Sequence, residues 1–391
     1  MSRPSLGLYT YSTAPRGSVV HAACLAEAMT DAGWDVTLYA LDKGDGRFFR
    51  DVRARVRLVP AGPAPATTAE LVKQRAHELA RYLLDVCPRH DVHHAEDCLT
   101  GSGLLAARDG GAPIELVRTV HHVERFTDPY LADCQERSIR RARLCLTVSR
   151  AAQLDVETTF GVRTDRVSNG VSVARFARCE PSRVAALRAR FGLSDDPVVL
   201  AVGGVEPRKN TLSTLRAFAL LRETIPEARL VIAGGATVLD HGAYRAEYER
   251  ALGAMPRATQ ERVHETGVVD EADVPSLFHL AEALSFPSLE EGFGLVALEA
   301  LAAGLPVVAS ALPPLTEFLD ETVAQLVDPR SEHALARALC AALAPSVARA
   351  AAGRRRARDY SWERVARMHV KAYQSVMGPD RRPRPSFEST A

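Results

Sequence analysis

The segment Leu289–Ser310, LEEGFGLVALEALAAGLPVVAS, places two glutamates eight residues apart around a Gly-Phe-Gly turn. The run ALSFPS just before it has the short, apolar character of a buried strand. The run LVALEALAA after the turn predicts a helix, because Gly304 can cap its carboxyl end and Pro306 stands just beyond. The segment therefore predicts a strand–loop–helix unit, the building block of a parallel α/β fold.

The same alternation of strand and helix patterns continues along most of the chain. Apolar residues at helical spacing fill segments such as 19–33 and 69–86. The predicted strands lie at residues 5–12, 34–41, 55–62, 91–97, 114–122, 143–149, 197–205, 228–235, 263–269, 282–288, 305–310 and 323–329. This order predicts stacked βα units in doubly wound parallel sheets.

The length of 391 residues exceeds one ordinary core and suits two domains. We expect an N-terminal Rossmann-like domain at residues 1–175 and a second at 176–362, because the strand pattern restarts after a polar, irregular stretch. A closing helix is predicted at 363–377. The Pro-, Arg- and Ser-rich residues 378–391 predict a disordered tail. In paired sheets of this type, ligands bind in loops at the carboxyl ends of the strands.

Composition restricts the class of partner. A hydrophobic fraction of 47%, a charged fraction of 25% and a net charge of +1 suit a globular protein without a general attraction to nucleic acid. Seven cysteines without a C-x-x-C pair indicate neither a disulfide framework nor a zinc site. With no signal-like leader and no membrane-length apolar run, we expect a cytoplasmic protein. The amphipathic stretch 73–89 would allow a peripheral contact with the inner membrane face.

The opening loop has the properties of an anion site. Gly292 and Gly294 allow close approach of the backbone, and the first amides of the helix attract negative charge. Glu299 is the one polar residue of that helix, so its carboxylate needs donors such as sugar hydroxyls. The alternative is that Glu299 pairs with a buried arginine while Glu291 is a solvated acid. For Glu290 an exposed structural position is the favoured interpretation.

A second loop of the same kind is VGGVEPRKN, residues 202–210. Arg208 and Lys209 are adjacent cations, and Asn210 is suited to cap the following helix. Lysine occurs at only four positions of the chain, 43, 73, 209 and 371, where arginine is otherwise the usual cation. Its use at position 209 favours a compact point charge beside phosphate over a solvated loop cation.

The two loops, in this order and about 80 residues apart, resemble those of the retaining GT-B glycosyltransferases of family four. Residues 291–310 match the family's E-G-F-G-x4-E-A-x-A-x-G-x-P-V-V-A-S motif nearly residue for residue. Further matches cover most of the chain: GSVVHAACLAEAMTDAGWDVTLYA, TVHHVE, LTVSRAAQLDVETTFGV, SNGVSVARF and YSWERVARMHVKAY. The resemblance implies a GT-B fold, with two Rossmann-like domains facing a cleft, and transfer of a hexose-type sugar from a nucleoside-diphosphate sugar with retention of configuration.

The resemblance also implies the roles of particular residues. Glu291 would contact hydroxyls of the transferred sugar, and Glu299 the ribose. Lys209 would neutralise the diphosphate leaving group, with catalytic roles for Glu291, His121 and Lys209. The amides around the diphosphate would be those of Gly292, Phe293, Gly294 and Leu295.

The remaining implied contacts come from both domains. His121 would reach the sugar from the first domain, Gly17 would line the floor near the phosphates, and the base would lie against the backbone of Val268. The family's usual arginine is replaced by Gly204, which leaves Arg208 as the candidate cation for donor binding. Two further positions depart from the family pattern. Ser18 stands in place of the second glycine of the first loop, and residues 168–172 read SNGVS where the family has PNGVD.

Metal and redox cofactors are not indicated. The sequence lacks the Asp-x-Asp motif of metal-dependent transferases, and His93 and His94 would point to opposite sides of one strand. The glycine pattern at 101–111 lacks the acidic residue expected for NAD. We therefore expect no cofactor, a nucleotide-sugar donor and a small-molecule, glycan or lipid-linked acceptor. Another GT-B enzyme, such as an epimerase or phosphorylase, and a non-catalytic nucleotide-sugar binder remain alternatives.

Overall fold

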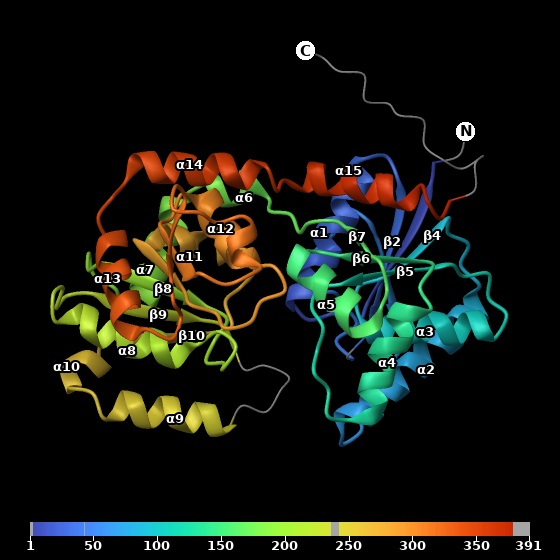
Figure 1. The fold of residues 1–391 in the computed structure, drawn as a ribbon, viewed down its shortest axis with the longest axis horizontal. Coiled ribbons are helices and arrows are strands. Elements are labelled where there is room, and N and C mark those ends of the chain that lie inside the picture. The colour runs from blue at the N-terminus through green and yellow to red at the C-terminus, as the bar shows by residue number, and fades with distance from the viewer. Residues whose placement is uncertain (1–2, 43, 236–241, 378–391) are drawn as a thin grey trace, which may run out of the picture. The chain divides into compact units, whose positions relative to one another are not determined.

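The computed structural model describes residues 3–42, 44–235 and 242–377. These residues form two compact units. Unit 1 consists of the chain up to Gly170 together with the segment from Trp362 onward, and unit 2 runs from Val171 to Ser361. Each unit is an open parallel β-sheet between layers of helices (Figure 1). The predicted α/β class with two doubly wound sheets is confirmed.

Unit 1 contains seven parallel strands in the order β3-β2-β1-β4-β5-β6-β7. Their bounds are β1 Ser5–Thr10, β2 Asp35–Leu41, β3 Arg55–Val59, β4 Val92–Ala95, β5 Leu116–Val120, β6 Leu144–Thr147 and β7 Asp165–Arg166. The first three strands are added toward one edge of the sheet and the strands from β4 onward toward the other, so the strand order reverses between the adjacent, parallel strands β1 and β4. The loops after these two strands therefore diverge, which opens a site at the carboxyl edge of the sheet.

Helices cover both faces of this sheet. They are α1 Gly17–Asp31, α2 Thr68–Val86, α3 Cys98–Asp109, α4 Pro129–Arg140, α5 Arg150–Phe160 and α15 Trp362–Tyr373. One core joins α1 and α15 to strand residues such as Leu8 and Leu38, and another joins α2 and α3 to Tyr9 and Tyr39. Adjacent strand residues thus point into opposite layers, as buried parallel strands require. In Figure 1, α15 lies beside α1 although about 330 residues separate them in the chain.

Unit 2 contains six parallel strands in the order β10-β9-β8-β11-β12-β13. Their bounds are β8 Val198–Val202, β9 Arg229–Ala233, β10 Val263–Gly267, β11 Ala283–Phe286, β12 Val307–Ser310 and β13 Ala324–Val327. The reversal of strand order falls between β8 and β11, which pair with each other. The loops after β8 and β11 are the two that the sequence analysis selected.

The helices of unit 2 are also split between two faces. They are α6 Val173–Ala177, α7 Pro181–Arg190, α8 Thr211–Arg222, α9 Gly242–Gly253, α10 Arg257–Gln260, α11 Val274–Leu280, α12 Leu295–Ala303, the 3-10 turn η1 Leu315–Glu317, α13 Glu332–Ala342 and α14 Val347–Arg358. A core of α8, α9 and α13 packs on one face, around Phe218, Tyr248 and Leu339. Helix α12 packs against α6, α11 and α14.

The structure differs from the sequence expectation in three details. The closing helix, expected at 363–377, is α15 and ends at Tyr373. Strand β7 was not predicted, because its two residues are exposed and carry no apolar pattern. The division between the units falls at Gly170/Val171, five residues before the expected 175/176 boundary. The reason is local: Val171 pairs with Ser361, and α6 packs on α12 within unit 2. The tail predicted at 378–391 lies outside the described residues.

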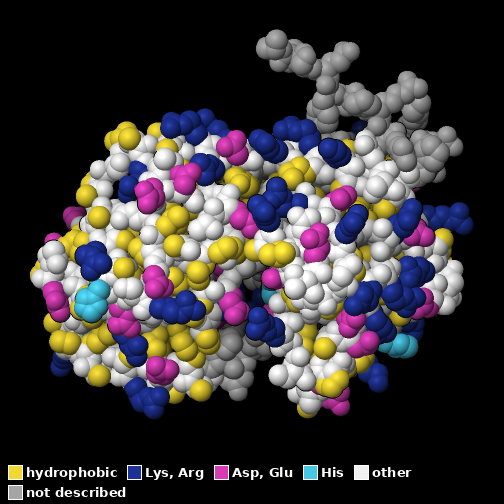
Figure 2. Space-filling view, in the orientation of Figure 1, with side chains coloured by type: hydrophobic (Ala, Val, Ile, Leu, Met, Phe, Trp, Pro, Cys, Tyr) yellow, Lys and Arg dark blue, Asp and Glu magenta, His cyan; other side chains and the backbone are white. Residues whose placement is uncertain are grey.

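The surface carries charges of both signs. Figure 2 shows basic and acidic side chains interspersed over the visible face, in keeping with the net charge of +1. Within the described ranges, no single helix is long and apolar enough to cross a membrane. The bent pair α13 and α14 passes that test of length and composition only when its two helices are taken together.

Candidate functional site

The loops after β8 and β11 lie against each other in unit 2. The backbone N–H of Leu289 donates to the carbonyl of Arg208 over 2.9 Å. The guanidinium of Arg208 also donates to the carbonyl of Glu290 over 3.3 Å. Two segments about 80 residues apart in sequence thus form one continuous surface at the switch point of the sheet.

Asn210 joins these loops in a way that the sequence analysis did not predict. It occupies the N-cap position of α8 but makes no side-chain cap bond, and its φ is +55°. Its side-chain amide donates instead to the carbonyls of Pro287, at 3.2 Å, and Pro329, at 2.7 Å. The expectation of a side-chain cap was wrong: the amide of Asn210 bonds two buried carbonyls instead, and the N–H of Leu212 in the first turn donates to the Tyr244 hydroxyl over 2.9 Å.

Lys209 and Glu291 form a close ion pair at the centre of the two loops. Lys209 Nζ lies 2.6 Å from Glu291 Oε1, and an Arg208 guanidinium nitrogen lies 3.2 Å from Glu291 Oε2. The side chains of Glu291 and Lys209 are only 9% and 12% exposed. The ammonium also lies 4.8 Å from the centre of the Phe286 ring. The structure therefore places both predicted cations on the predicted sugar-facing glutamate.

The charge state of Glu291 follows from these contacts. Burial by itself would raise the pKa of this carboxyl, but the charges of Lys209 and Arg208 and the Lys209 hydrogen bond outweigh it. The pKa of Glu291 is therefore lowered from its usual value, and the group is ionised at neutral pH. Glu290 is exposed, as expected. Glu291 is not the solvated acid of the alternative interpretation.

Gly204 cannot hold the arginine that the family usually has at this position. Its φ is +75°, and a Cβ there would lie 2.9 Å from the carbonyl oxygen of Gly235. Its N–H donates to Ala233 O over 3.1 Å, and its carbonyl accepts from Thr211 Oγ1 over 2.8 Å. Gly204 thus shapes the backbone beside the site, while Arg208 is the residue that brings a second cation to Glu291.

The start of α12 supplies backbone donors. Gly294 precedes the helix with a φ of +105°, and a Cβ at this position would collide with the side chain of Leu315. Within the described ranges, the N–H groups of Leu295 and Val296 have no hydrogen-bond acceptor. These groups and the positive end of the helix dipole favour an anion at this point.

Phe293 takes a structural position in the same loop. Its ring stacks on Phe318 with centroids 5.1 Å apart and is 6% exposed. The side chain therefore packs in the core of unit 2, and only the backbone of Phe293 and of its neighbour Gly292 is available to a ligand.

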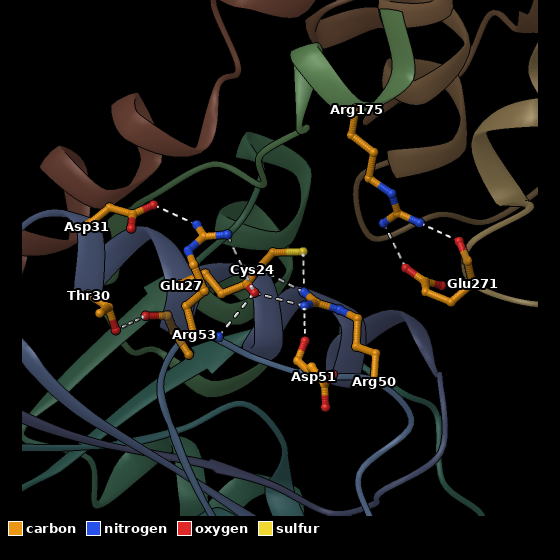
Figure 3. Close-up of polar contacts among 10 residues, drawn as sticks. Cys24, Glu27, Thr30, Asp31, Arg50, Asp51, Arg53, Arg175 and Glu271 are labelled. Carbon is orange, nitrogen blue, oxygen red and sulfur yellow. Dashed lines mark hydrogen bonds and ion pairs between the residues drawn. The ribbon is translucent and has the colours of Figure 1, made fainter. Parts of the chain in front are cut away.

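Glu299 lies in α12 with part of its side chain accessible. Among the described residues, no hydrogen bond or ion pair is formed by its carboxylate. The burial of most of the side chain raises its pKa to about 8; Arg175 opposes this rise and Glu271 adds to it. Arg175, from α6, is itself paired with Glu271 over 2.7 Å (Figure 3). The alternative in which Glu299 pairs with a buried arginine is therefore not realised.

Val268 lies at the carboxyl edge of the sheet, beside the backbone that follows β8, β9 and β10. It follows β10 directly and is 71% exposed, which is unusual for an apolar side chain. Gly203, Gly234 and Gly267 line the same edge with positive φ, and Gly234 N–H donates to Gly267 O over 3.0 Å. An exposed apolar side chain beside accessible backbone is suited to a flat aromatic ligand.

The predicted residues of unit 1 lie at its own switch point. Gly17 is the first residue of α1, with open space where a Cβ would stand. His121 follows β5, and its Nε2 lies 2.9 Å from Glu96 Oε2. His21, on α1, has its Nε2 3.7 Å from the same oxygen. The sequence analysis missed His21, because its position in an apolar helix shows no motif.

Burial governs the ionisation of this group. It lowers the pKa of His21 and of His121 to about 3, so both rings are neutral at pH 7. It also raises the pKa of Glu96, against the opposing effects of His21, His369 and Arg118. Asp97, the neighbour of Glu96, caps α3 by accepting from Thr100 N–H over 2.8 Å.

His93 and His94 have separate partners, as their alternation along β4 predicts. His93 Nδ1 lies 2.9 Å from the hydroxyl of Tyr9. His94 lies 2.7 Å from both the Tyr373 hydroxyl and the Thr119 hydroxyl. These two histidines are therefore buried hydrogen-bonding residues of the two core layers.

Comparison with known proteins agrees with this architecture. Residues 185–359 match the family "Glycosyl transferases group 1", and residues 15–175 match "Glycosyltransferase Family 4". The D-inositol 3-phosphate glycosyltransferase of Salinispora tropica is 31% identical over 361 residues, which cover 83% of this chain and 73% of that protein.

Solved structures share the fold across nearly the whole chain. Sucrose-phosphate synthase from Thermosynechococcus elongatus superposes with a TM-score of 0.78 at 23% identity, covering 96% of this chain and 99% of that one. Anabaena HepE in complex with UDP and glucose gives 0.76 at 20% identity, covering 95% and 99%. This chain therefore belongs to the glycosyltransferases of family four, which have the GT-B fold.

Proposed function

We propose that the enzyme transfers a hexose-type sugar from a nucleoside-diphosphate sugar to an acceptor hydroxyl, with retention of configuration and without a metal ion in the transfer step. The observation that carries the proposal is the grouping of Lys209, Arg208 and Glu291 in unit 2 at the switch point that also holds the free amides of α12. Two cations and two backbone donors suit a diphosphate.

The ion pair defines what the donor must displace. Both cations are bound to Glu291, which keeps the three charges satisfied. A diphosphate carries more negative charge than one carboxylate, so it would draw Lys209 and Arg208 toward itself. Glu291 would then be free to accept hydrogen bonds from hydroxyls of the transferred sugar.

The rest of the donor follows the geometry of unit 2. Glu299 has no protein partner among the described residues, and we assign it to the ribose hydroxyls. The base would lie against the backbone of Val268, with the backbone of Gly292, Phe293, Gly294 and Leu295 around the diphosphate.

The reaction breaks the bond between the anomeric carbon and the diphosphate oxygen, and the electron pair leaves with the diphosphate. Lys209, Arg208 and the α12 amides stabilise the charge that develops there. The acceptor oxygen forms the new bond to the anomeric carbon, and its proton passes to the leaving phosphate. Glu291 would hold hydroxyls of the sugar, and the family resemblance implies the same role for His121. Retention is inferred from the family resemblance alone.

The identity of donor and acceptor is open to direct screening. One solved relative of similar fold was crystallised with UDP and glucose, and a relative in sequence is named for D-inositol 3-phosphate. We take UDP-glucose as the first donor to test, and small molecules, glycans and lipid-linked sugars as acceptor classes. Cytoplasmic location and peripheral contact with the inner membrane face belong to the same proposal.

A thermal-shift panel of UDP-, GDP- and ADP-sugars tests donor binding, with EDTA present in one arm and Mg²⁺ in another. A ligand at 100 times its Kd stabilises by about 2.7 kcal/mol, so a true donor should raise the Tm by several degrees in both arms. A shift only with Mg²⁺ would contradict the metal-independent step. Absence of any shift across the panel would contradict donor binding.

Glu291→Ala then separates sugar contact from diphosphate binding. The variant frees Lys209 and Arg208, so the nucleoside diphosphate should bind at least as well as to the parent enzyme, while sugar transfer is lost. Glu290→Ala is the matched control, since this neighbouring glutamate is exposed. Near-full transfer by Glu291→Ala with the true substrates would remove the assigned role.

A further inference from the structure

A cluster of three potential metal ligands lies in unit 1, apart from the residues assigned to the diphosphate. We call it the His-Glu-His cluster: His21 from α1, Glu96 after β4, and His121 after β5. One ligand atom from each residue lies within 4.8 Å of the other two. The three elements converge at the switch point of the unit 1 sheet.

Two members of the cluster have polar atoms that lack partners. His21 is 1% exposed and Glu96 is 1% exposed. Across the described part of the chain, neither ring nitrogen of His21 has a hydrogen-bond partner, and Glu96 Oε1 has none either. Buried polar groups are almost always satisfied, so atoms left without a partner indicate a bound group that fills the gap. A buried imidazole with both nitrogens unpaired is difficult to explain by packing alone.

The spacing suits a small, tetrahedrally coordinated cation. Two ligands that each lie about 2.1 Å from Zn²⁺ at a tetrahedral angle stand roughly 3.4 Å apart. The observed separations of 2.9 Å for His121 Nε2 and 3.7 Å for His21 Nε2 from Glu96 Oε2 lie on either side of that value. A shift of a few tenths of an ångström would bring each histidine nitrogen to that distance from Glu96 Oε2, and the ligand atoms of the two histidines lie within 4.8 Å of each other.

The ligand types indicate which metal would bind. Imidazole nitrogens favour transition metals, whereas Mg²⁺ and Ca²⁺ favour sites built from oxygen. Two histidines and one carboxylate leave at least one coordination position free. The side chain of His121 is 15% exposed, so solvent can reach that edge of the cluster.

The surroundings of the cluster hold it in place. The His21 ring meets Trp362 edge-on with centroids 5.2 Å apart, and it meets the His121 ring edge-on at 4.9 Å. The positive charge of Arg118, a buried residue of β5, would repel a metal ion in the cluster. The carboxyl groups of Glu96 and Asp97 face that charge.

We propose that the His-Glu-His cluster binds one divalent transition-metal ion, of which Zn²⁺ is the best fit, through His21 Nε2, Glu96 and His121 Nε2. The ion would provide a partner for His21 Nε2, which has no hydrogen bond among the described residues. This site is separate from the diphosphate-binding residues of unit 2 but shares His121 with the proposed sugar contact. Metal binding is therefore measured without donor, so that its outcome and that of the proposed function are distinguishable.

Titration of the metal-free full chain with Co²⁺ tests the site directly. We expect visible absorption bands of a four- or five-coordinate Co²⁺ complex that saturate at one equivalent and are abolished by one equivalent of Zn²⁺. His21→Gln and Glu96→Gln should each weaken binding at least tenfold. His122→Gln is the matched control, because this exposed neighbour of His121 is outside the cluster and should leave binding unchanged.

Folding of each variant is checked by circular dichroism and thermal unfolding without metal. If the two buried variants do not fold, His121→Gln decides, because it lies at the accessible edge of the cluster. Absence of the absorption bands with the parent protein overturns the proposal. Unchanged Co²⁺ affinity in the folded His21, Glu96 or His121 variants also overturns it, since the ion would then bind elsewhere.

Discussion

The switch points of the two units have the same topology but differ in the charge state of the side chains that gather there. In unit 2, Lys209, Arg208 and Glu291 are charged and satisfy one another. In unit 1, burial keeps His21 and His121 neutral, and His21 lacks any hydrogen-bond partner among the described residues. A parallel sheet therefore determines where polar groups gather, while the local charge determines which ligand they can accept.

The difference has a physical origin in the way each group was brought together. The unit 2 charges come from two loops that contact each other, so opposite charges can move into direct pairs. The unit 1 groups come from a buried helix face and two strand ends, which are held by packing. Charges on loops that contact each other can pair, but polar atoms on a packed core keep the positions that packing imposes.

Ion pairs of the same kind but with more exposure occur elsewhere in unit 1. Figure 3 shows Arg50 and Arg53 reaching Glu27 and Asp31 of α1. Arg50 is 18% exposed and bonds Glu27 through two nitrogens, whereas Arg53 is 63% exposed. Pairs of this type hold a loop on a helix and contribute little individually.

The largest effect is expected from removing one of the two cations that contact Glu291 in unit 2. Lys209→Ala should lower kcat/KM for sugar transfer by about 10²–10³-fold, the usual effect of removing one preorganised electrostatic contact. The Tm should change little, because Arg208 still pairs with Glu291. Steady-state kinetics and thermal unfolding measure the two effects. Lys371→Ala, an exposed lysine of α15, is the control and should match the parent enzyme.

The second prediction concerns backbone conformation at the two switch points. Gly204→Ala should destabilise the protein by about 1–3 kcal/mol, because alanine is strained at a positive φ and its Cβ would meet a carbonyl oxygen. Gly17→Ala should be close to neutral, since there is open space at that position. Chemical denaturation of both variants tests this difference. Equal losses would show that the φ of Gly204 carries no stability cost.

The third prediction sharpens the contrast between satisfied and unsatisfied histidines. His94→Phe should cost about 1–3 kcal/mol, because it leaves the Thr119 and Tyr373 hydroxyls without their partner. His21→Phe should be nearly neutral in metal-free protein, since it removes nitrogens that have no partner. Denaturation in EDTA measures both. A larger loss for His21→Phe would contradict the description of its nitrogens as unpaired.

The smallest expected effect concerns Glu299, whose pKa of about 8 makes it largely protonated at pH 6.5 and ionised at pH 9.5. An ionised carboxylate accepts hydrogen bonds more strongly than a neutral acid, so donor affinity should rise about five- to tenfold over that range. Glu299→Gln should remove the dependence of donor affinity on pH.

The same carboxyl should affect stability. Because the folded pKa of Glu299 is raised, the native carboxyl stabilises the protein at low pH, and that contribution is lost as the pH rises through 8. The Gln variant should lack this loss in pH-dependent unfolding.

The regular elements were predictable because their patterns are local. Strands β8 and β11 and helix α12 lie where the apolar runs and the Gly304 cap indicated. The same is true of the loop that contains Gly292 and Gly294. Two-residue strand β7 was missed, because an exposed pair of polar residues carries no such pattern.

The interactions of the site were less predictable, because they join segments that are far apart in sequence. The cap expected at Asn210 became a bridge between Pro287 and Pro329. The position of Gly204 was expected to lack only a cation, yet its positive φ and the nearby Gly235 carbonyl show that any larger side chain would be strained there. The partners of Asn210 and the space at Gly204 both depend on which backbone carbonyls lie nearby after folding.

The sequence by itself determined the α/β class, most of the strands along the chain and the two loops that carry Lys209 and Glu291, since periodicity and glycine placement are properties of neighbouring residues. Only the tertiary structure decided that these two side chains bind each other and that His21 meets Glu96 and His121. The physical reason is that hydrogen bonding and burial depend on distances between residues that the chain separates by 75 positions or more.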